Sequence, residues 1–251
     1  MTTTTQETGP MRDGGAPPLP HPAAHAGGPG GHTGGVIAHG LYGMIDPGVL
    51  AHGATDTVLH AEAVRQGRLL LEEGIRTLQL RVKGVSSERR RAVLDDLAQV
   101  AERLGLLQDD VCWIVNDDVD VARGAGTRHP RCLAHLGQED GPDPDVPFGR
   151  STHTLAQVRD RGNAAYIGFG PVFGTATKDT GYDARGVDLL RAAVTASSVP
   201  VVAIGGITLD TLASVQATGV HAWAVIGAIW RAPDPRAEVR RFVSASERPG
   251  R

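Results

Sequence analysis

Short apolar runs rich in Val, Ile and Leu alternate with longer amphipathic stretches from about residue 39 onward. We interpret the short runs as strands and the stretches between them as helices. The eight runs are Leu41–Ile45, Thr77–Arg81, Cys112–Val115, Cys132–Leu136, Phe148–Ser151, Ala165–Phe169, Val201–Ile204 and Ala222–Ile226. The run Phe148–Ser151 is the weakest strand prediction, because Gly149 and Arg150 are poor strand formers.

The stretches between the runs have helical periodicity. Two predicted apolar faces are Leu59, Ala63, Leu69 and Leu70, and Leu94, Leu97, Val100 and Leu104. Gly74 follows the first face in the place of a helix C-cap. Strands that alternate with helices predict a parallel sheet, and eight strands are the number that closes a single (β/α)₈ TIM barrel. An open doubly wound sheet is the alternative, but no G-x-G-x-x-G turn follows the first strand.

Composition divides the chain into three parts. We expect a disordered N-terminal tail over residues 1–38, rich in Gly, Pro, Ala and His, a barrel domain over 39–245 and a frayed C-terminus over 246–251. The net charge of -3 and the lack of a basic run argue against nucleic-acid binding. There is no apolar run of about 18 residues and no signal-peptide pattern, so we expect a cytoplasmic protein without a membrane span. Cys112 and Cys132 are expected to be buried thiols. The sequence leaves the oligomeric state open.

Polar residues follow the second predicted strand, at the barrel rim where functional residues are expected. Gln79, Arg81 and Lys83 alternate with apolar neighbours, so we expect all three to point into the mouth of the barrel. Two cations in such a place are costly unless an anion pairs with them, and an Arg fork with a Lys charge suits a diphosphate. The alternative is a solvated Arg and Lys at a strand end.

Acidic residues follow the next two strands. Asn116 and Asp117 end the third strand, and Asp140 lies just beyond the fourth. These carboxylates could cap the following helices. Their place on neighbouring strands favours another interpretation, in which Asp117 and Asp140 hold Mg²⁺ against the phosphates of a substrate.

Two further groups on the same rim carry hydroxyl, imidazole and amine chemistry. Ser151 offers a hydroxyl to an anion after the fifth strand, and His153 is a candidate acid or base, or only a polar start to the next helix. A long segment after the sixth strand contains Thr175, Thr177 and Lys178. A segment of that length is usually functional, and we expect it to close over a phosphate as a lid.

Glycines follow the last two strands. Gly206 comes after the seventh strand, and Ile226 and Gly227 come at the end of the eighth. Glycines let backbone amides approach an anion, and barrels often bind a phosphate monoester at this place. With the cationic group, two anion sites are predicted. They point to a transferase that joins two phosphorylated compounds and releases pyrophosphate.

Short strings along the chain carry a family resemblance. They are Leu41-Tyr42 with Asp46, Gln79-Leu80-Arg81, Asn116-Asp117 with Val119-Asp120, His135-Leu136-Gly137-Gln138-Glu139-Asp140, Ser151 with His153-Thr154, Gly168-Phe169-Gly170-Pro171-Val172-Phe173, Thr175 with Thr177-Lys178, and Ala203-Ile204-Gly205-Gly206-Ile207. From Leu41 to about Trp230 the chain resembles thiamine-phosphate synthases and their thiazole-tautomerase relatives. Each string is short, but their order and spacing together are specific.

The resemblance implies that a hydroxymethylpyrimidine diphosphate loses pyrophosphate and that a thiazole phosphate captures the resulting cation to give thiamine phosphate. It assigns three sets of residues: the pyrimidine diphosphate to Gln79, Arg81, Lys83, Asn116, Ser151 and Lys178; Mg²⁺ to Asp117 and Asp140; the thiazole phosphate to Thr175, Thr177, Gly206, Ile226 and Gly227. Arg81, Lys83, Ser151 and Lys178 are the expected catalytic residues.

The chain departs from the family pattern at Val82, where an acidic residue is usual, at Gly227, where Ser is usual, and in the longer segment 127–131. The last departure leaves the direction of Asp140 open. Two other functions remain as alternatives. One is a thiazole tautomerase-like isomerase with His153 as its base, which would have little need of the metal pair, Arg81 and Lys178. The other is a non-catalytic, phosphate-binding regulatory barrel.

Overall fold

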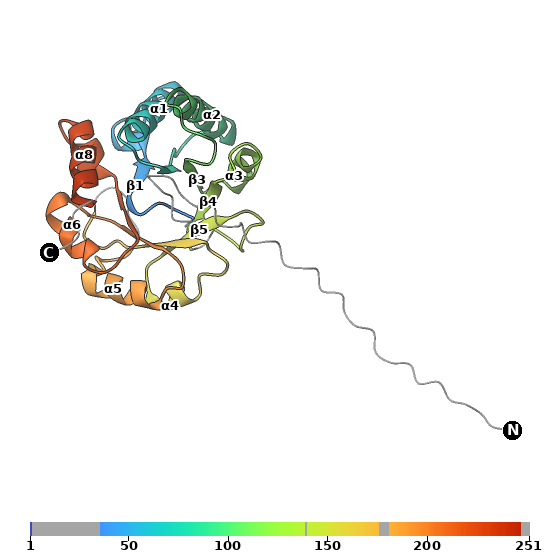
Figure 1. Ribbon diagram of the computed structural model, residues 1–251, viewed down its shortest axis with the longest axis vertical. Coiled ribbons are helices and arrows are strands. Elements are labelled where there is room, and N and C mark those ends of the chain that lie inside the picture. Colours follow the sequence, from blue (N-terminus) through green and yellow to red (C-terminus); the bar gives the residue numbers. More distant parts are fainter. Residues whose placement is uncertain (2–35, 139, 176–180, 247–251) are drawn as a thin grey trace. The chain divides into compact units, whose positions relative to one another are not determined.

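Eight parallel strands close into a barrel in the computed structural model, which describes residues 1, 36–138, 140–175 and 181–246 (Figure 1). The strands are β1 (Gly40–Ile45), β2 (Thr77–Leu80), β3 (Cys112–Asn116), β4 (Cys132–Leu136), β5 (Phe148–Thr152), β6 (Tyr166–Phe169), β7 (Val201–Ile204) and β8 (Ala222–Val225). Each strand pairs with the next along the chain, and β1 pairs with β8 through Leu41 opposite Trp223. The predicted (β/α)₈ barrel is therefore confirmed.

Helices surround the barrel (Figure 1). They are the short 3₁₀ helix η1 (Pro47–Val49) and α1 (Asp56–Glu72), α2 (Ser87–Arg103), α3 (Val119–Gly126), α4 (Leu155–Arg159), α5 (Gly186–Ala196), α6 (Leu209–Gln216), α7 (Gly227–Trp230) and α8 (Pro235–Ser246). The predicted apolar faces of α1 and α2 are buried, except that Leu104 lies at the C-cap of α2 and is exposed. Between β4 and β5 the described residues form no helix, so the expected alternation fails at that one step.

The weakest predicted strand is fully formed, and the structure gives the reason for its glycine. A Cβ on Gly149 would lie 2.1 Å from Cζ of Tyr166, which stands on the neighbouring strand β6. The glycine is therefore required by packing, although its strand propensity is low. Arg150 is buried and forms an ion pair with Asp143 over 3.0 Å.

The barrel encloses a small core of its own, separate from the apolar layer under the helices. Ile37 belongs to this inner core and is 2% exposed, and the Ala38 backbone N–H donates to Oγ1 of Thr77 over 2.8 Å. The barrel domain thus takes in residues just before the predicted boundary at residue 38. At the same end of the barrel, Gly40 lies against Ser246, the last residue of α8. Residues 2–35 of the predicted N-terminal tail and residues 247–251 lie outside the described part of the chain.

Two smaller expectations are also tested by the structure. Cys112 and Cys132 are both buried free thiols, as expected, and burial raises the pKa of each to about 12. Among the residues that the structure describes, we find no helix with the length and apolar character needed to cross a bilayer.

Candidate active site

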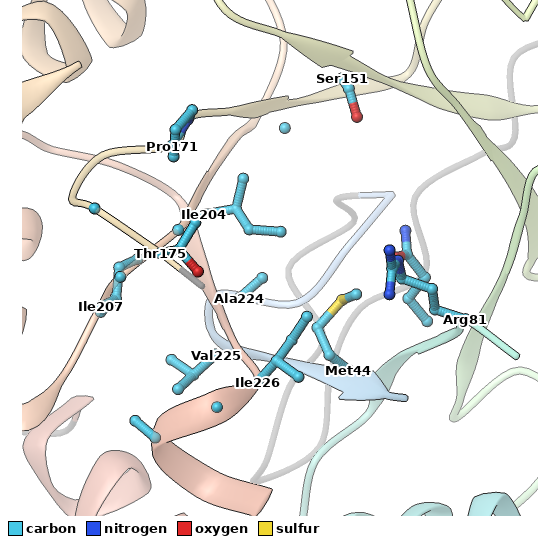
Figure 2. Close-up of a pocket in the computed structure, with 18 of the residues that line it drawn as sticks. Met44, Arg81, Ser151, Pro171, Thr175, Ile204, Ile207, Ala224, Val225 and Ile226 are labelled. Atoms are coloured by element: carbon cyan, nitrogen blue, oxygen red, sulfur yellow. The ribbon is translucent and has the colours of Figure 1, made fainter. Parts of the chain in front are cut away.

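A cavity of about 330 Å³ opens where the strands end, at the C-terminal rim of the barrel (Figure 2). All eight strands or the turns that follow them contribute to its wall, from Met44 of β1 to Ala224 of β8. Figure 2 shows Arg81 on one side of the cavity and Thr175, Ile204 and Ile207 on the other. The cavity therefore lies where the sequence predicts a functional site.

Gln79, Arg81 and Asn116, which were predicted to bind a diphosphate, line one side of the cavity. The guanidinium of Arg81 forms an ion pair with Asp46, just after β1, and only 12% of the Arg81 side chain is exposed. The Asp46 backbone N–H donates to Oε1 of the buried Gln66 of α1 over 2.8 Å. In the sequence Asp46 stands out only as part of the string with Leu41-Tyr42, and that string does not predict its ion pair with Arg81.

Lys83 does not lie where it was predicted. It was placed in the barrel mouth by extending the alternation of β2, but β2 ends at Leu80. Beyond that residue the backbone turns, and Lys83 is exposed and is not part of the cavity wall. Val82, the next residue after Arg81, packs in the apolar layer under the helices.

The carboxylates after β3 divide into two kinds. Asp118 is the N-cap of α3: it accepts from the Val121 N–H over 3.1 Å and forms an ion pair with Arg90 over 2.8 Å. Burial raises the pKa of Asp118, but the hydrogen bonds from Ser87, Val121 and Arg90 outweigh this effect and hold the pKa below its usual value. Capping is thus the function of Asp118.

Asp117 and Asp140, the predicted metal ligands, are both exposed, and neither is part of the cavity wall. Asp117 has a φ of 58°, and its backbone N–H donates to the His135 carbonyl over 2.9 Å. It is the one described non-glycine residue with positive φ, a conformation that often marks functional positions. The Asp140 carboxylate accepts from the Gly137 N–H. No cluster of three or more His, Cys, Asp or Glu residues occurs in the described ranges.

The glycine-rich turns form the opposite side of the cavity. Thr175, Gly206, Ile226 and Gly227, which were predicted to bind a phosphate monoester, all line it. Gly206 has a φ of +65°, and a Cβ there would come within 2.5 Å of the Gly174 carbonyl oxygen. Only glycine fits at this turn. Thr177 and Lys178, the other two predicted residues of this segment, lie outside the described residues.

Arg231, at the C-cap of α7, also lines the cavity and was missed by the sequence analysis. It is exposed, and within the described part of the chain no carboxylate lies within ion-pair distance of it. It stands four residues after Gly227, on the same face of the helical turn. The signal available in the sequence was weak, because Arg231 does not directly follow a strand.

Hydrogen bonds also cross the interior of the barrel, and we call them the interior hydrogen-bond chain. The Gln79 amide donates to the Tyr42 hydroxyl over 3.1 Å, and the Tyr42 and Tyr166 hydroxyls lie 2.8 Å apart. The Tyr166 hydroxyl lies 2.8 Å from His135 Nδ1, and His135 Nε2 lies 3.0 Å from Ser151 Oγ. The chain thereby joins two predicted binding residues, Gln79 and Ser151, which both line the cavity.

The fold and the cavity together define a (β/α)₈-barrel protein with a small-molecule site at the C-terminal rim. A family model described as thiamine monophosphate synthase matches residues 51–229. The chain therefore belongs to the thiamine monophosphate synthase family.

Individual relatives agree with this assignment. The chain is 34% identical over 197 residues to thiamine-phosphate synthase of Anaeromyxobacter dehalogenans, covering 74% of this chain and 84% of that protein. It is 30% identical over 218 residues to thiamine-phosphate synthase of Caldivirga maquilingensis, covering 83% and 97% of the two chains. Among solved structures, thiamine phosphate pyrophosphorylase from Pyrococcus furiosus is similar, with a TM-score of 0.66, 28% identity and coverage of 83% and 95%.

Proposed function

We propose that this chain is a thiamine-phosphate synthase. It condenses 4-amino-2-methyl-5-(diphosphooxymethyl)pyrimidine with 4-methyl-5-(2-phosphooxyethyl)thiazole to give thiamine phosphate and pyrophosphate. The observation that carries the proposal is that Arg81 and the glycine-rich turns face one cavity, so that both phosphorylated substrates can be held together. Its cytoplasmic location stays a prediction.

The reaction breaks one bond and forms one. The C–O bond between the pyrimidine methylene group and the diphosphate breaks, and the diphosphate leaves with the electron pair. The lone pair of the thiazole nitrogen then forms the new C–N bond, and no oxidant or proton transfer is needed. Arg81 compensates the charge that develops on the leaving oxygens, with Lys178 from the segment after β6. Gln79, Asn116 and Ser151 hold the rest of this substrate.

The residues present fit Mg²⁺ as the metal. Asp117 and Asp140 follow the adjacent strands β3 and β4, and both residues are exposed. One or two carboxylates with substrate phosphate oxygens are the donor set that Mg²⁺ prefers. A bound Mg²⁺ supplies charge neutralisation for the leaving diphosphate. The positive φ of Asp117 fixes where its carboxylate leaves the strand end.

The thiazole phosphate takes the other side of the cavity. The backbone amides at Gly206, Ile226 and Gly227 bind its phosphate, with hydroxyls from Thr175 and Thr177. Arg231 adds a positive charge on the same side, where Gly227 provides no hydroxyl.

The direct test mixes the purified protein with both substrates and Mg²⁺ and measures thiamine phosphate. Asp117→Ala and Lys178→Ala should each lower turnover strongly, whereas Asp120→Ala, on the exposed face of α3, should be near normal. No product beside an active control enzyme would refute the proposal. Isomerisation of the thiazole phosphate without any pyrimidine would instead support the isomerase alternative with His153.

A further inference from the structure

The interior hydrogen-bond chain has a direction, because the group at one of its ends, Nε2 of Gln79, can only donate. The Gln79 Nε2 group donates to the Tyr42 hydroxyl, so the single proton of Tyr42 is left for Tyr166. The proton of Tyr166 is then left for Nδ1 of His135. A neutral imidazole that accepts at one nitrogen carries its proton on the other, so His135 donates from Nε2 to Ser151 Oγ.

The surroundings keep this direction fixed. Tyr166 is fully buried and Tyr42 is 2% exposed, so water does not compete for their hydroxyls. Burial raises the pKa of both phenols well above the usual value, and each therefore keeps its proton at neutral pH. Gly149 leaves the space that the Tyr166 ring and its hydroxyl occupy, because a Cβ there would collide with both.

We propose that Tyr42, Tyr166 and His135 are positioning residues that select the pyrimidine substrate by hydrogen-bond polarity. Because Ser151 Oγ accepts from His135, the Ser151 proton is directed to a ligand. Because Nε2 of Gln79 is occupied by Tyr42, Oε1 is the amide atom left for a ligand. The two ends of the chain thus offer the cavity one donor and one acceptor.

An aminopyrimidine is the complement of this pair, because it presents an amine that donates and ring nitrogens that accept. An oxopyrimidine, in which a carbonyl replaces the amine, meets the Gln79 oxygen with a second acceptor. A polar site of this kind rejects a mismatched analogue far more strongly than an apolar pocket does, by up to about 10⁴-fold. The inference rests on the proposed function and adds to it the reason for the choice of ring.

The experiment compares kcat/KM for the aminopyrimidine diphosphate with kcat/KM for its 4-oxo analogue. Tyr166→Phe removes the hydroxyl in the middle of the interior hydrogen-bond chain. The Gln79 amide and the His135 imidazole can then each exchange their donor and acceptor atoms. We expect the ratio of the two kcat/KM values to fall at least tenfold, which corresponds to about 1.4 kcal/mol. The KM for the thiazole phosphate, which the proposed function places on the other side of the cavity, should change less than twofold.

Further variants make the test independent of one substitution. Tyr42→Phe breaks the interior hydrogen-bond chain next to Gln79 and should lower the ratio of kcat/KM values in the same way. It serves as the test even if Tyr166→Phe does not fold. His135→Gln keeps one acceptor and one donor and should retain more of the discrimination than His135→Leu. Thermal melting confirms that each variant is folded.

The experiment distinguishes failure of the proposed function from failure of the positioning inference. If the wild-type protein makes no thiamine phosphate, the proposed function falls and the polarity inference falls with it. If the wild type is active, and Tyr42→Phe and Tyr166→Phe fold but lose kcat/KM for both pyrimidines by the same factor, only the positioning inference is refuted. Equal losses would mean that Tyr42, Tyr166 and His135 only support the fold.

Discussion

The Arg81–Asp46 ion pair predicts opposite effects on stability and on anion binding. Asp46→Asn keeps an oxygen that can accept from Arg81 but removes the negative charge. Only 6% of the Asp46 side chain is exposed, so Arg81 loses its charge partner in a poorly solvated place. Breaking a buried pair costs about 3–5 kcal/mol. Because Arg81 faces the cavity, we expect about 2 kcal/mol here, a fall in Tm of roughly 4–8 °C.

The same change should strengthen the binding of pyrophosphate, the product that carries the charges Arg81 is expected to meet. Two unit charges about 8 Å apart interact by about 2 kcal/mol at an effective dielectric constant near 20. Removing the repulsion from Asp46, after allowance for screening by salt, should lower the Kd about tenfold. The measurements are chemical denaturation without ligand and calorimetric titration with pyrophosphate and Mg²⁺.

A matched control exists in the Arg150–Asp143 pair, which is also poorly exposed at its arginine and lies outside the cavity wall. Asp143→Asn should lower stability and leave pyrophosphate binding unchanged. Weaker pyrophosphate binding by Asp46→Asn would show that the carboxylate chiefly orients Arg81. An unchanged Tm would show that the pair contributes no stability.

Other predictions concern packing, capping and the tail. Gly149→Ala should lower the free energy of unfolding by about 3 kcal/mol, because its methyl group meets the Tyr166 ring. Gly124→Ala in α3, with open space around it, should raise the free energy of unfolding by about 1 kcal/mol. Thermal melting measures both effects. Asp118→Asn should lower the free energy of unfolding by about 1 kcal/mol at pH 7, because Asn still caps α3 but loses the charge that strengthens the hydrogen bonds from Arg90 and Ser87. Because the folded-state pKa of Asp118 is lowered, its contribution is present above about pH 4 and is lost as pH falls further, so denaturation curves of variant and wild type should converge in acid. Deleting residues 2–35 of the N-terminal tail should leave kcat/KM unchanged, because the described residues already form the cavity wall between Met44 and Arg231; a large loss would contradict this expectation.

Much of the fold could be predicted from sequence because strands covered on both faces are rich in apolar residues. That pattern located all eight strands to within about one residue, including Cys132–Leu136 and Val201–Ile204. The expectation that functional residues follow the strands at the C-terminal rim then located most of the cavity wall, because the strand ends of a closed barrel converge on one place. Lys83 was misplaced because alternation holds only while the strand continues.

The parts of the site that the sequence did not predict depend on contacts between residues far apart in the sequence. Asp46 meets Arg81 across 35 positions, and Tyr42 meets Tyr166 across 124, so no local pattern contains either pair. Both tyrosines lie within apolar runs and are indistinguishable there from ordinary core residues. Gly149 counted against its strand by propensity, yet Tyr166 requires it.

The contact between Gly40 and Ser246 implies that the barrel has no structurally privileged starting point. Because β1 pairs with β8 as any strand pairs with its neighbour, the two ends of the barrel domain lie side by side. A short peptide could join them without distorting either element, and new termini could be opened in an exposed loop between other units. The order of the strands around the barrel, and the cavity they surround, would then survive a circular permutation of the chain.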